Sequence, residues 1–203
     1  MSRDVTKYVR DGVRWPSASD IVTASGLSSG LSQFDPDWVA ARAHFGSCVH
    51  QGVELHLEDR LDWDDLDPQL LPYLEQFLAF ERATGFRPMS IEIDIENAAL
   101  RYCGQLDAVG TAPLMGVEAP AIWDWKTARS WVDSWAIQMA LYAMADRFDT
   151  PPRRFGVRIN EDRWWVKEYT ADEDFFVAKN AVSETWRQIE SGELVLPSEN
   201  TED

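Results

Sequence analysis

The chain has 203 residues, 45% of them hydrophobic, enough to bury one substantial core, so we expect a single domain over residues 1–192. The two cysteines, Cys48 and Cys103, form no CxxC pair, which argues against a zinc knuckle, an iron-sulfur cluster and a disulfide framework, and favours a reducing compartment such as the cytoplasm. The net charge of −16 argues against a broadly basic surface for nucleic acid.

The charge is unevenly distributed along the chain. Residues 58–67 carry six acids against one base, and residues 193–203 carry four acids and no base, so we expect a disordered acidic tail at 193–203. Between residues 126 and 167, eight Lys or Arg outnumber five Asp or Glu, which leaves room for a basic face. The N-terminus lacks the apolar core of a signal peptide, and no run approaches the roughly 18 apolar residues of a membrane span. We therefore expect a cytoplasmic protein with no membrane partner.

The first third of the chain is predicted to be helical. Residues 16–21 combine a proline with capping residues and predict a short helix, and residues 26–32 form a flexible Gly/Ser connection. Asp35 followed by proline opens a second helix, which we expect to continue to Leu57 with a break at Gly46.

A third helix and a strand follow. Asp67 with Pro68 repeats the cap signal, an apolar stripe at helical spacing runs over 70–78, and Gly85 ends the helix. Strict alternation of apolar and polar residues over 89–96 predicts a strand with one solvent-exposed face. Solvent explains its acidic side chains, Glu92 among them, more simply than a functional site does.

Two further runs predict an antiparallel hairpin. Residues 99–109 and 121–126 are both β-like, and the connection between them is rich in Gly and Pro. Asp107 lies near the end of the first run and Asp124 lies in the second. Pairing of the two strands would bring these carboxylates together.

Asp124 and Lys126 are candidates for chemistry. Because side chains alternate along a strand, these two project to one face, while Trp123 and Trp125 turn to the other. Two carboxylates and a lysine suit a Mg²⁺ or Mn²⁺ ion, because carboxylates bind hard cations and the lysine can orient a water or neutralise a phosphate.

His50 is the candidate third ligand. Glu54 lies four residues further along the same helix, where it would orient the imidazole or accept its hydrogen bond. A lone histidine on a helix is more often a structural residue, and only the carboxylates described above favour a role for His50 at a metal.

The last third is predicted as helix, hairpin and helix. A helix is indicated over 132–148, strands over 153–159 and 164–169, and a final helix that opens with a capping box at 170–173 and ends at Gly192. Gln138 and Tyr142, four apart on the first of these helices, form either a polar ledge or a half-exposed packing pair.

Five short motifs in this order resemble the RecB-type branch of the PD-(D/E)XK nuclease superfamily, which includes phage and mitochondrial genome-maintenance exonucleases. The resemblance covers roughly residues 15 to 170, and Ser19 stands where that branch usually has Thr. The motifs are the Pro-Ser entry at 16–19, the stretch 46–50 with Glu54, GxxD at 104–107, DxK at 124–126 and QxxxY at 138–142.

The resemblance implies an α/β, restriction-endonuclease-like core with a mixed central β-sheet flanked by α-helices, and hydrolysis of phosphodiester bonds with one or two Mg²⁺ or Mn²⁺ ions. The family's iron-sulfur subgroup needs cysteines that this chain lacks. Lys126 would position the attacking water, and Gln138 and Tyr142 would organise the site or touch DNA. The implied metal ligands are His50, Asp107, Asp124 and the Trp125 backbone carbonyl, with Glu54 behind them.

DNA contacts are expected from the entry motif, at Ser17 and Ser19, and from Arg129 with Trp131. Trp131 and Trp135 could stack bases. They could equally be core residues, and core is the simpler interpretation.

The sequence therefore predicts a metal-dependent DNA nuclease, an exonuclease acting on single strands or DNA ends. Its partner would be DNA, with a recombination or single-strand-binding protein as a further candidate, because relatives often have one. Two alternatives stay open. The first is a catalytically silent DNA-binding or scaffolding member of the same fold, and the second is an acidic DNA-mimic inhibitor that uses residues 58–67 and the tail. A complete set of metal-site residues counts against the mimic.

Overall fold

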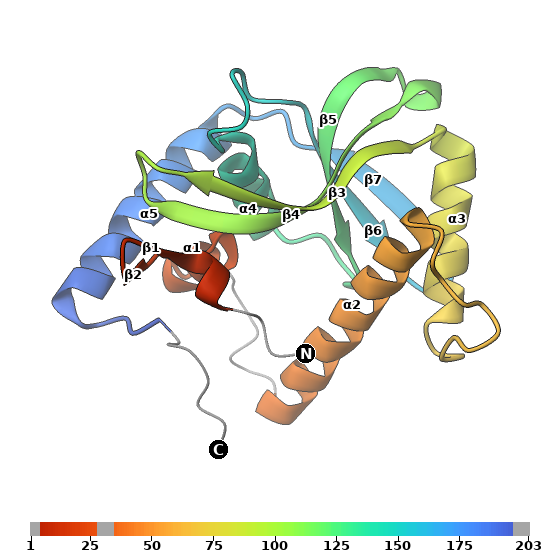
Figure 1. The fold of residues 1–203 in the computed structure, drawn as a ribbon, viewed down its shortest axis with the longest axis horizontal. Helices are drawn as coiled ribbons and strands as arrows, with labels where there is room; N and C mark the ends of the chain where they lie inside the picture. The colour runs from red at the N-terminus through yellow and green to blue at the C-terminus, as the bar shows by residue number, and fades with distance from the viewer. Residues whose placement is uncertain (1–4, 28–34, 197–203) are drawn as a thin grey trace.

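A computed structural model describes residues 5–27 and 35–196. Its centre is a five-stranded mixed sheet with helices on both faces, so the predicted α/β fold class is confirmed (Figure 1). The helices are α1 (Ala18–Ala24), α2 (Pro36–Leu57), α3 (Leu71–Thr84), α4 (Ser134–Ala143) and α5 (Glu173–Ser191), with short 3-10 turns η1 (Val5–Tyr8) and η3 (Pro113–Met115). The sheet contains β3 (Arg87–Asn97), β4 (Tyr102–Ala112), β5 (Val117–Lys126), β6 (Arg154–Ile159) and β7 (Trp164–Glu168), and a separate ribbon pairs β1 (Val9–Arg10) with β2 (Val13–Arg14).

The strand order follows the chain, β3-β4-β5-β6-β7, and α4 lies between β5 and β6 in the sequence. The predicted hairpin forms, because β4 and β5 are antiparallel with Ala108 opposite Trp123. β5 and β6 are parallel, with Asp124 opposite Gly156, and β7 returns antiparallel to β6. A parallel pair needs a crossover connection, which here includes α4.

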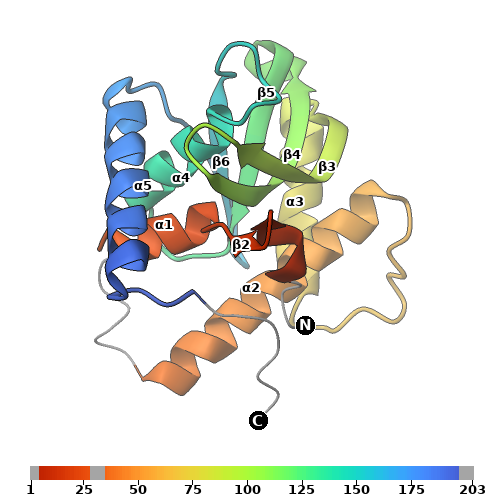
Figure 2. The ribbon, with the colours of Figure 1, turned by 60° about the vertical axis from the view of Figure 1, so that its left-hand side comes forward.

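The sheet separates two hydrophobic cores. On one face α1, α4 and α5 pack against residues such as Ile122, and on the other α2 and α3 pack against Trp123 and Trp125 (Figure 2). The second core is rich in aromatic side chains, including Phe155, which stacks on Trp123 with ring centroids 4.4 Å apart. Residues 121–125 of β5 are buried on both faces of the sheet.

α2 is one continuous helix, so the predicted break at Gly46 is wrong. The glycine serves close packing instead, because a Cβ atom at this position would lie 3.1 Å from Thr127 Oγ1, just beyond the end of β5. This contact brings α2 against the strand that carries Asp124 and Lys126.

α4 ends at Ala143, earlier than the predicted 148. The turn that follows is held by the end of β3: the Asn97 side-chain amide donates to the Met144 carbonyl at 2.6 Å, and the Asp146 N–H donates to the Glu96 carbonyl at 2.8 Å. These tertiary hydrogen bonds outweigh the local helical pattern.

The predicted capping box before α5 does not form, since Asp172 is the N-cap and makes no side-chain cap bond. Arg154 on β6 holds this helix start, donating to the Ala171 carbonyl at 2.9 Å and pairing with Asp174 at 3.2 Å. The predicted helix stop at Gly192 is confirmed, with a left-handed φ of 77°.

Other boundaries differ by a few residues. Asp67 caps only a turn, and α3 begins at Leu71 and ends at Thr84, with the predicted Gly85 as its C-cap. β4 begins at Tyr102 rather than 99, because residues 98–101 form the turn from β3. Residues 28–34 and 197–203, which include most of the predicted connection and tail, lie outside the described residues. Within the described ranges, no helix has the length and apolar character needed to cross a bilayer.

Candidate active site

Asp124 and Lys126 form an ion pair at the end of β5. Lys126 Nζ lies 2.5 Å from Asp124 Oδ2, and the Asp124 residue is 2% exposed. Trp123 and Trp125 point into the second core on the opposite face, so the alternation predicted for this strand is confirmed.

Asp107 on β4 joins the same site. The Trp125 backbone N–H donates to Asp107 Oδ2 at 2.6 Å, and Asp107 Oδ1 lies 3.4 Å from His50 Nδ1 on α2. The hairpin and α2 therefore bring three of the predicted ligands into one buried region. Trp125 contacts the site through its backbone N–H, and the role of its carbonyl as a ligand stays a prediction.

His50 faces Asp107 rather than its helical neighbour Glu54. The expectation that Glu54 orients the imidazole is wrong, because within the described chain no hydrogen bond joins these two side chains and the buried Asp107 carboxylate is the imidazole's partner. Glu54 lies instead where its charge acts on Glu92.

α4 supplies a hydrogen-bonded support for the lysine. Lys126 Nζ donates to Gln138 Oε1 at 2.9 Å, and Gln138 Nε2 donates to the Tyr142 hydroxyl at 2.8 Å. Tyr142 is 4% exposed, and a Cβ at Gly104 would lie 3.2 Å from its ring, so the glycine of GxxD lets β4 approach α4. The QxxxY pair thus organises the lysine.

The two carboxylates are held in different electrostatic environments. Burial raises the pKa of Asp124 to about 6, with Asp107 adding to the rise and Lys126 opposing it. Burial also acts to raise the pKa of Asp107, but His50, Lys126 and the Trp125 N–H together hold it below its usual range. Burial alone would lower the pKa of His50, and the Asp107 charge raises it on balance. Separated values of this kind are typical of functional sites.

Glu92 on β3 borders the site, although the sequence favours a solvated face over a place at the site for Glu92 and Glu96. It lies between Ile91 and Ile93, which pair with Ala108 and Leu106, and so it sits across the ladder from Asp107. Burial raises the Glu92 pKa to about 7, and the Asp107 charge raises it further. Its φ of 47° is rare for a non-glycine residue inside a strand. The alternating pattern of 89–96 could not show that this side chain faces another strand's carboxylate rather than solvent.

The entry motif has a structural role. The Ser17 hydroxyl accepts from the Asp20 N–H at 3.1 Å and caps α1, while the Ser17 residue is 5% exposed and bridges Cys103 beside the GxxD motif. Its predicted DNA contact stays a prediction. Ser19 is half-buried on α1, and its role stays a prediction.

Arg129 and Trp131 lie on the connection after β5. Arg129 is exposed, and its carbonyl accepts a hydrogen bond from Arg158 on β6. Trp131 is half-buried and belongs to neither core, so the core interpretation is wrong for this residue. Trp135 does pack against the first core.

The donor set suits a hard divalent cation. Two carboxylates and an imidazole are ligands for Mg²⁺ or Mn²⁺, and Asp124 Oδ2 is buried without a hydrogen bond of good geometry despite its ion pair. Over residues 5–27 and 35–196, no three His, Cys, Asp or Glu side chains are placed to hold one ion. Asp107 pairs with His50 and Asp124 with Lys126, so binding requires the carboxylates to turn from these partners.

No family model matches the chain, and no curated protein does. Among solved structures, the crystal structure of SSO0001 is similar at a TM-score of 0.49 and 15% identity, over 92% of this chain and 81% of that one. We infer nothing about function from a similarity of this size.

Proposed function

We propose that the chain is a divalent-metal-dependent nuclease that hydrolyses phosphodiester bonds in DNA, acting as an exonuclease on single strands or ends. The observation that carries the proposal is the position of Lys126, held between Asp124 on its own strand and Gln138 on α4, with Asp107 on the neighbouring strand. The resemblance of the DxK, GxxD and QxxxY motifs to RecB-type nucleases supports the same conclusion.

In this proposal, Asp107, Asp124 and His50 hold the ion, with the Trp125 carbonyl as a further ligand. A bound divalent ion would offset charge on the phosphoryl oxygens and lower the pKa of a coordinated water. Mg²⁺ and Mn²⁺ both prefer the oxygen ligands that dominate this set.

Lys126 contributes directly to hydrolysis. Its ammonium has three N–H donors, of which the present contacts to Asp124 and Gln138 account for two. The third is available to orient the attacking water or to contact a phosphoryl oxygen. Negative charge develops on those oxygens in the transition state, where a fixed cation in a buried site is most effective.

The test is cleavage of end-labelled single- and double-stranded DNA with Mg²⁺ or Mn²⁺, comparing the wild-type protein with Asp124→Asn and Lys126→Ala. The matched control is Lys179→Ala, at an exposed lysine on α5. We expect the wild type and the control to shorten the DNA from its ends and both site variants to lose cleavage. Unchanged activity in Lys126→Ala would refute the assigned role, whereas an intact circular single strand cut as fast as a linear one would refute the exonuclease assignment.

A catalytically silent DNA-binding protein is the second candidate. It is favoured by the pairing of Asp107 with His50 and of Asp124 with Lys126. Within the described chain, no three His, Cys, Asp or Glu side chains are placed to bind one metal ion. Calorimetric Mn²⁺ binding without cleavage of any DNA would support it over the nuclease.

A further inference from the structure

A strip of tryptophans and cations covers one side of the β6–β7 half of the sheet. Its members come from the connection after β5, from α4, from β6 and β7 and from the turn between these two strands, and their rings and charges contact one another. We define this Trp–cation strip as Trp131, Trp135, Trp165, Arg158, Arg163 and Lys167.

The strip begins at the candidate active site. Lys126 Nζ lies 5.8 Å from the centroid of the Trp135 ring, and the Trp135 and Trp131 rings meet edge to face at 5.6 Å. The Trp131 ring is 5.5 Å from the Arg158 guanidinium and 5.9 Å from Lys167 Nζ. Contacts therefore run without a gap from the catalytic lysine to the outer strand.

The strip continues along β7, the edge strand. The Arg158 guanidinium lies 3.6 Å from the centroid of the Trp165 ring, and Arg163 lies 5.5 Å from the same ring. Trp165 and Arg158 are register partners, and Arg158 is in turn the partner of Lys126 on β5. Directly opposed residues share a face, so the ladder itself places these side chains on the side of the sheet that carries Asp124.

Gly156 makes room for the strip beside the active site. It pairs with Asp124 on one side and with Lys167 on the other, and a Cβ there would lie 3.3 Å from the Trp131 ring. Trp131 can thus lie over β6 while its outer part stays exposed. Neither Trp131 nor Trp165 belongs to a hydrophobic core of the described chain, so packing does not account for them.

The cations of the strip lack carboxylate partners within the described chain. Arg158, Arg163 and Lys167 form no ion pair there, in contrast to Arg153 and Arg154 at the start of β6, which pair with acids at 2.7 and 3.2 Å. Arg158 is 7% exposed and its Nε has no hydrogen-bond partner. In a chain with a net charge of −16, cations without carboxylate partners gathered beside half-buried tryptophans indicate a polyanionic ligand.

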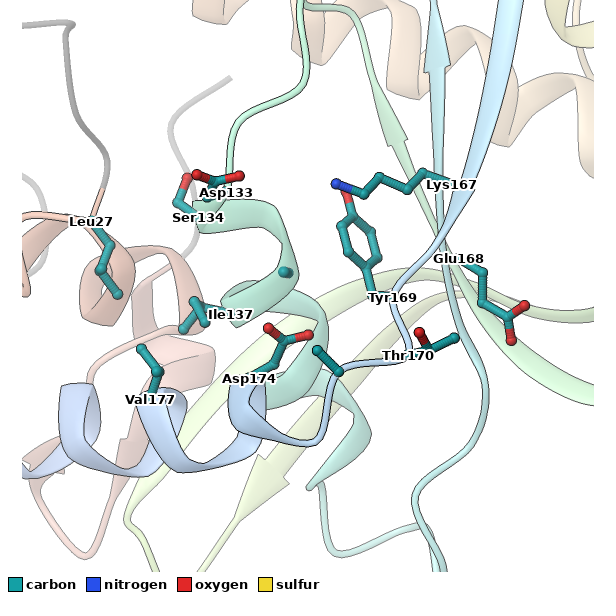
Figure 3. A pocket seen from close by; sticks show the side chains of 12 residues that line it. Leu27, Asp133, Ser134, Ile137, Lys167, Glu168, Tyr169, Thr170, Asp174 and Val177 are labelled. Carbon is teal, nitrogen blue, oxygen red and sulfur yellow. The ribbon is translucent and has the colours of Figure 1, made fainter.

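The neighbouring cavity does not suit that ligand. This hollow of about 420 Å³ lies at the end of β7, where Lys167 and Tyr169 lie side by side and Asp133 and Asp174 lie across from them (Figure 3). Its carboxylates would repel phosphates, so they mark a boundary of the strip.

We propose that the Trp–cation strip binds a single strand of DNA, with bases stacked on its tryptophans and phosphates paired with its cations, and that the strand reaches the candidate active site at Lys126. The proposal rests on the nuclease function proposed above and names its substrate. Unpaired bases expose faces that can stack on tryptophan, whereas a duplex hides them. Stacking of this kind accepts any base, as a nuclease without sequence preference requires.

The test is fluorescence anisotropy of a labelled oligo(dT) strand in EDTA, which prevents cleavage and leaves binding as the only readout. The charge variants are Arg163→Glu and Lys167→Glu, and the ring variants are Trp131→Leu and Trp165→Leu. The matched controls are Lys179→Glu on α5 and Trp63→Leu, both at exposed positions outside the strip. Thermal melting of each variant checks that the fold is kept.

We expect the wild type and the controls to bind equally well. Each ring variant should bind roughly 5- to 100-fold more weakly, as expected for loss of one stacked base. Each charge variant should weaken binding and reduce the slope of log K against log salt by about 0.7, as expected for loss of one phosphate contact on a single strand. Unlabelled duplex should compete poorly.

The proposal that the strip binds single-stranded DNA would be refuted if the ring and charge variants kept wild-type affinity. It would also be refuted if duplex DNA competed as well as oligo(dT). The two proposals fail separately. If the variants lose DNA binding but the wild-type protein cuts no DNA, the binding role of the strip is supported and the nuclease function is refuted. If the wild-type protein cuts DNA but the strip variants bind it as tightly as the wild type, the nuclease function is supported and the binding role of the strip is refuted.

Discussion

Lys126 Nζ lies 2.5 Å from Asp124 Oδ2, two residues away on the same strand, and the two side chains share a buried face of β5. A lysine this close to a carboxylate neutralises it while no other cation is present. In the proposed nuclease, a divalent ion at the carboxylates would supply the charge that Lys126 now offsets, and Gln138 would then be the residue that holds the lysine in place. The proposed active site would therefore depend on how α4 holds the lysine.

The first prediction concerns that anchor. Gln138→Leu removes the acceptor for Lys126 and the donor to Tyr142, so the lysine loses its fixed position. We expect kcat to fall by about tenfold to 100-fold with a smaller change in KM, because misplacement by about 1 Å costs this much. Single-turnover cleavage measures it. Tyr142→Phe leaves the contact between Gln138 and Lys126 intact, so its kcat should fall much less. An equal fall of kcat in both variants would contradict a positioning role for Gln138.

The second prediction concerns pH. Burial raises the folded-state pKa of Glu92 to about 7 from an ordinary value of 4.5, so the folded protein binds more protons than the unfolded chain between these values. The Glu92 carboxylate therefore lowers the free energy of unfolding fully above about pH 7, and this effect is absent below about pH 4.5. We expect Glu92→Gln to raise the melting temperature in EDTA at about pH 8 and to change it little at about pH 4.5. A variant destabilised equally at both pH values would show that the Glu92 carboxylate is not held at an electrostatic cost.

The third prediction concerns metal binding. Asp107 is the link between His50 and the β5 backbone, so Asp107→Asn should abolish calorimetric Mn²⁺ binding. We expect His50→Ala to weaken it at least about tenfold and Glu54→Gln to have a smaller effect, since Glu54 does not contact the imidazole. The control is His56→Ala, whose imidazole pairs with Glu81 away from the site. Loss of Mn²⁺ affinity in the control as large as in His50→Ala would contradict the ligand set.

The fourth prediction concerns the hairpin that carries Asp107. A Cβ at Gly110 would lie 2.5 Å from the Arg87 carbonyl and 3.0 Å from the Phe86 ring, at a register shift between β4 and β5. We expect Gly110→Ala to destabilise the protein by about 1–3 kcal/mol, because backbone on β3 has to move. Urea denaturation measures it, and a midpoint equal to that of the wild type would show that the strands tolerate the side chain.

The sequence predicts those parts of the site that depend on local periodicity. Alternation along β5 is enough to put Asp124 and Lys126 on one face, and the Gly/Pro connection is enough to pair their strand with that of Asp107. The helical spacing of Gln138 and Tyr142 similarly predicts that they meet, and they do.

The rest depends on contacts between distant segments. The His50 imidazole pairs with Asp107 and not with Glu54 because α2 packs across the hairpin that carries Asp107. Glu92 lies opposite Asp107 because of the register between β3 and β4. Neither register nor packing is encoded in a short pattern. From the sequence alone Trp131 is interpreted as a core residue for the same reason, since only the pairing of β6 with β7 shows that its ring lies over Gly156 of β6, beside Arg158 and Lys167.

We propose that His50, Asp107 and Asp124 converge on one divalent cation. Crystals grown or soaked in Mn²⁺ test it most directly, through an anomalous difference map. The account predicts a peak between the Asp107 and Asp124 carboxylates, with oxygen ligands at about 2.0–2.3 Å and the His50 imidazole adjacent. A map with no peak there at saturating Mn²⁺, and with Lys126 still paired to Asp124, would contradict it.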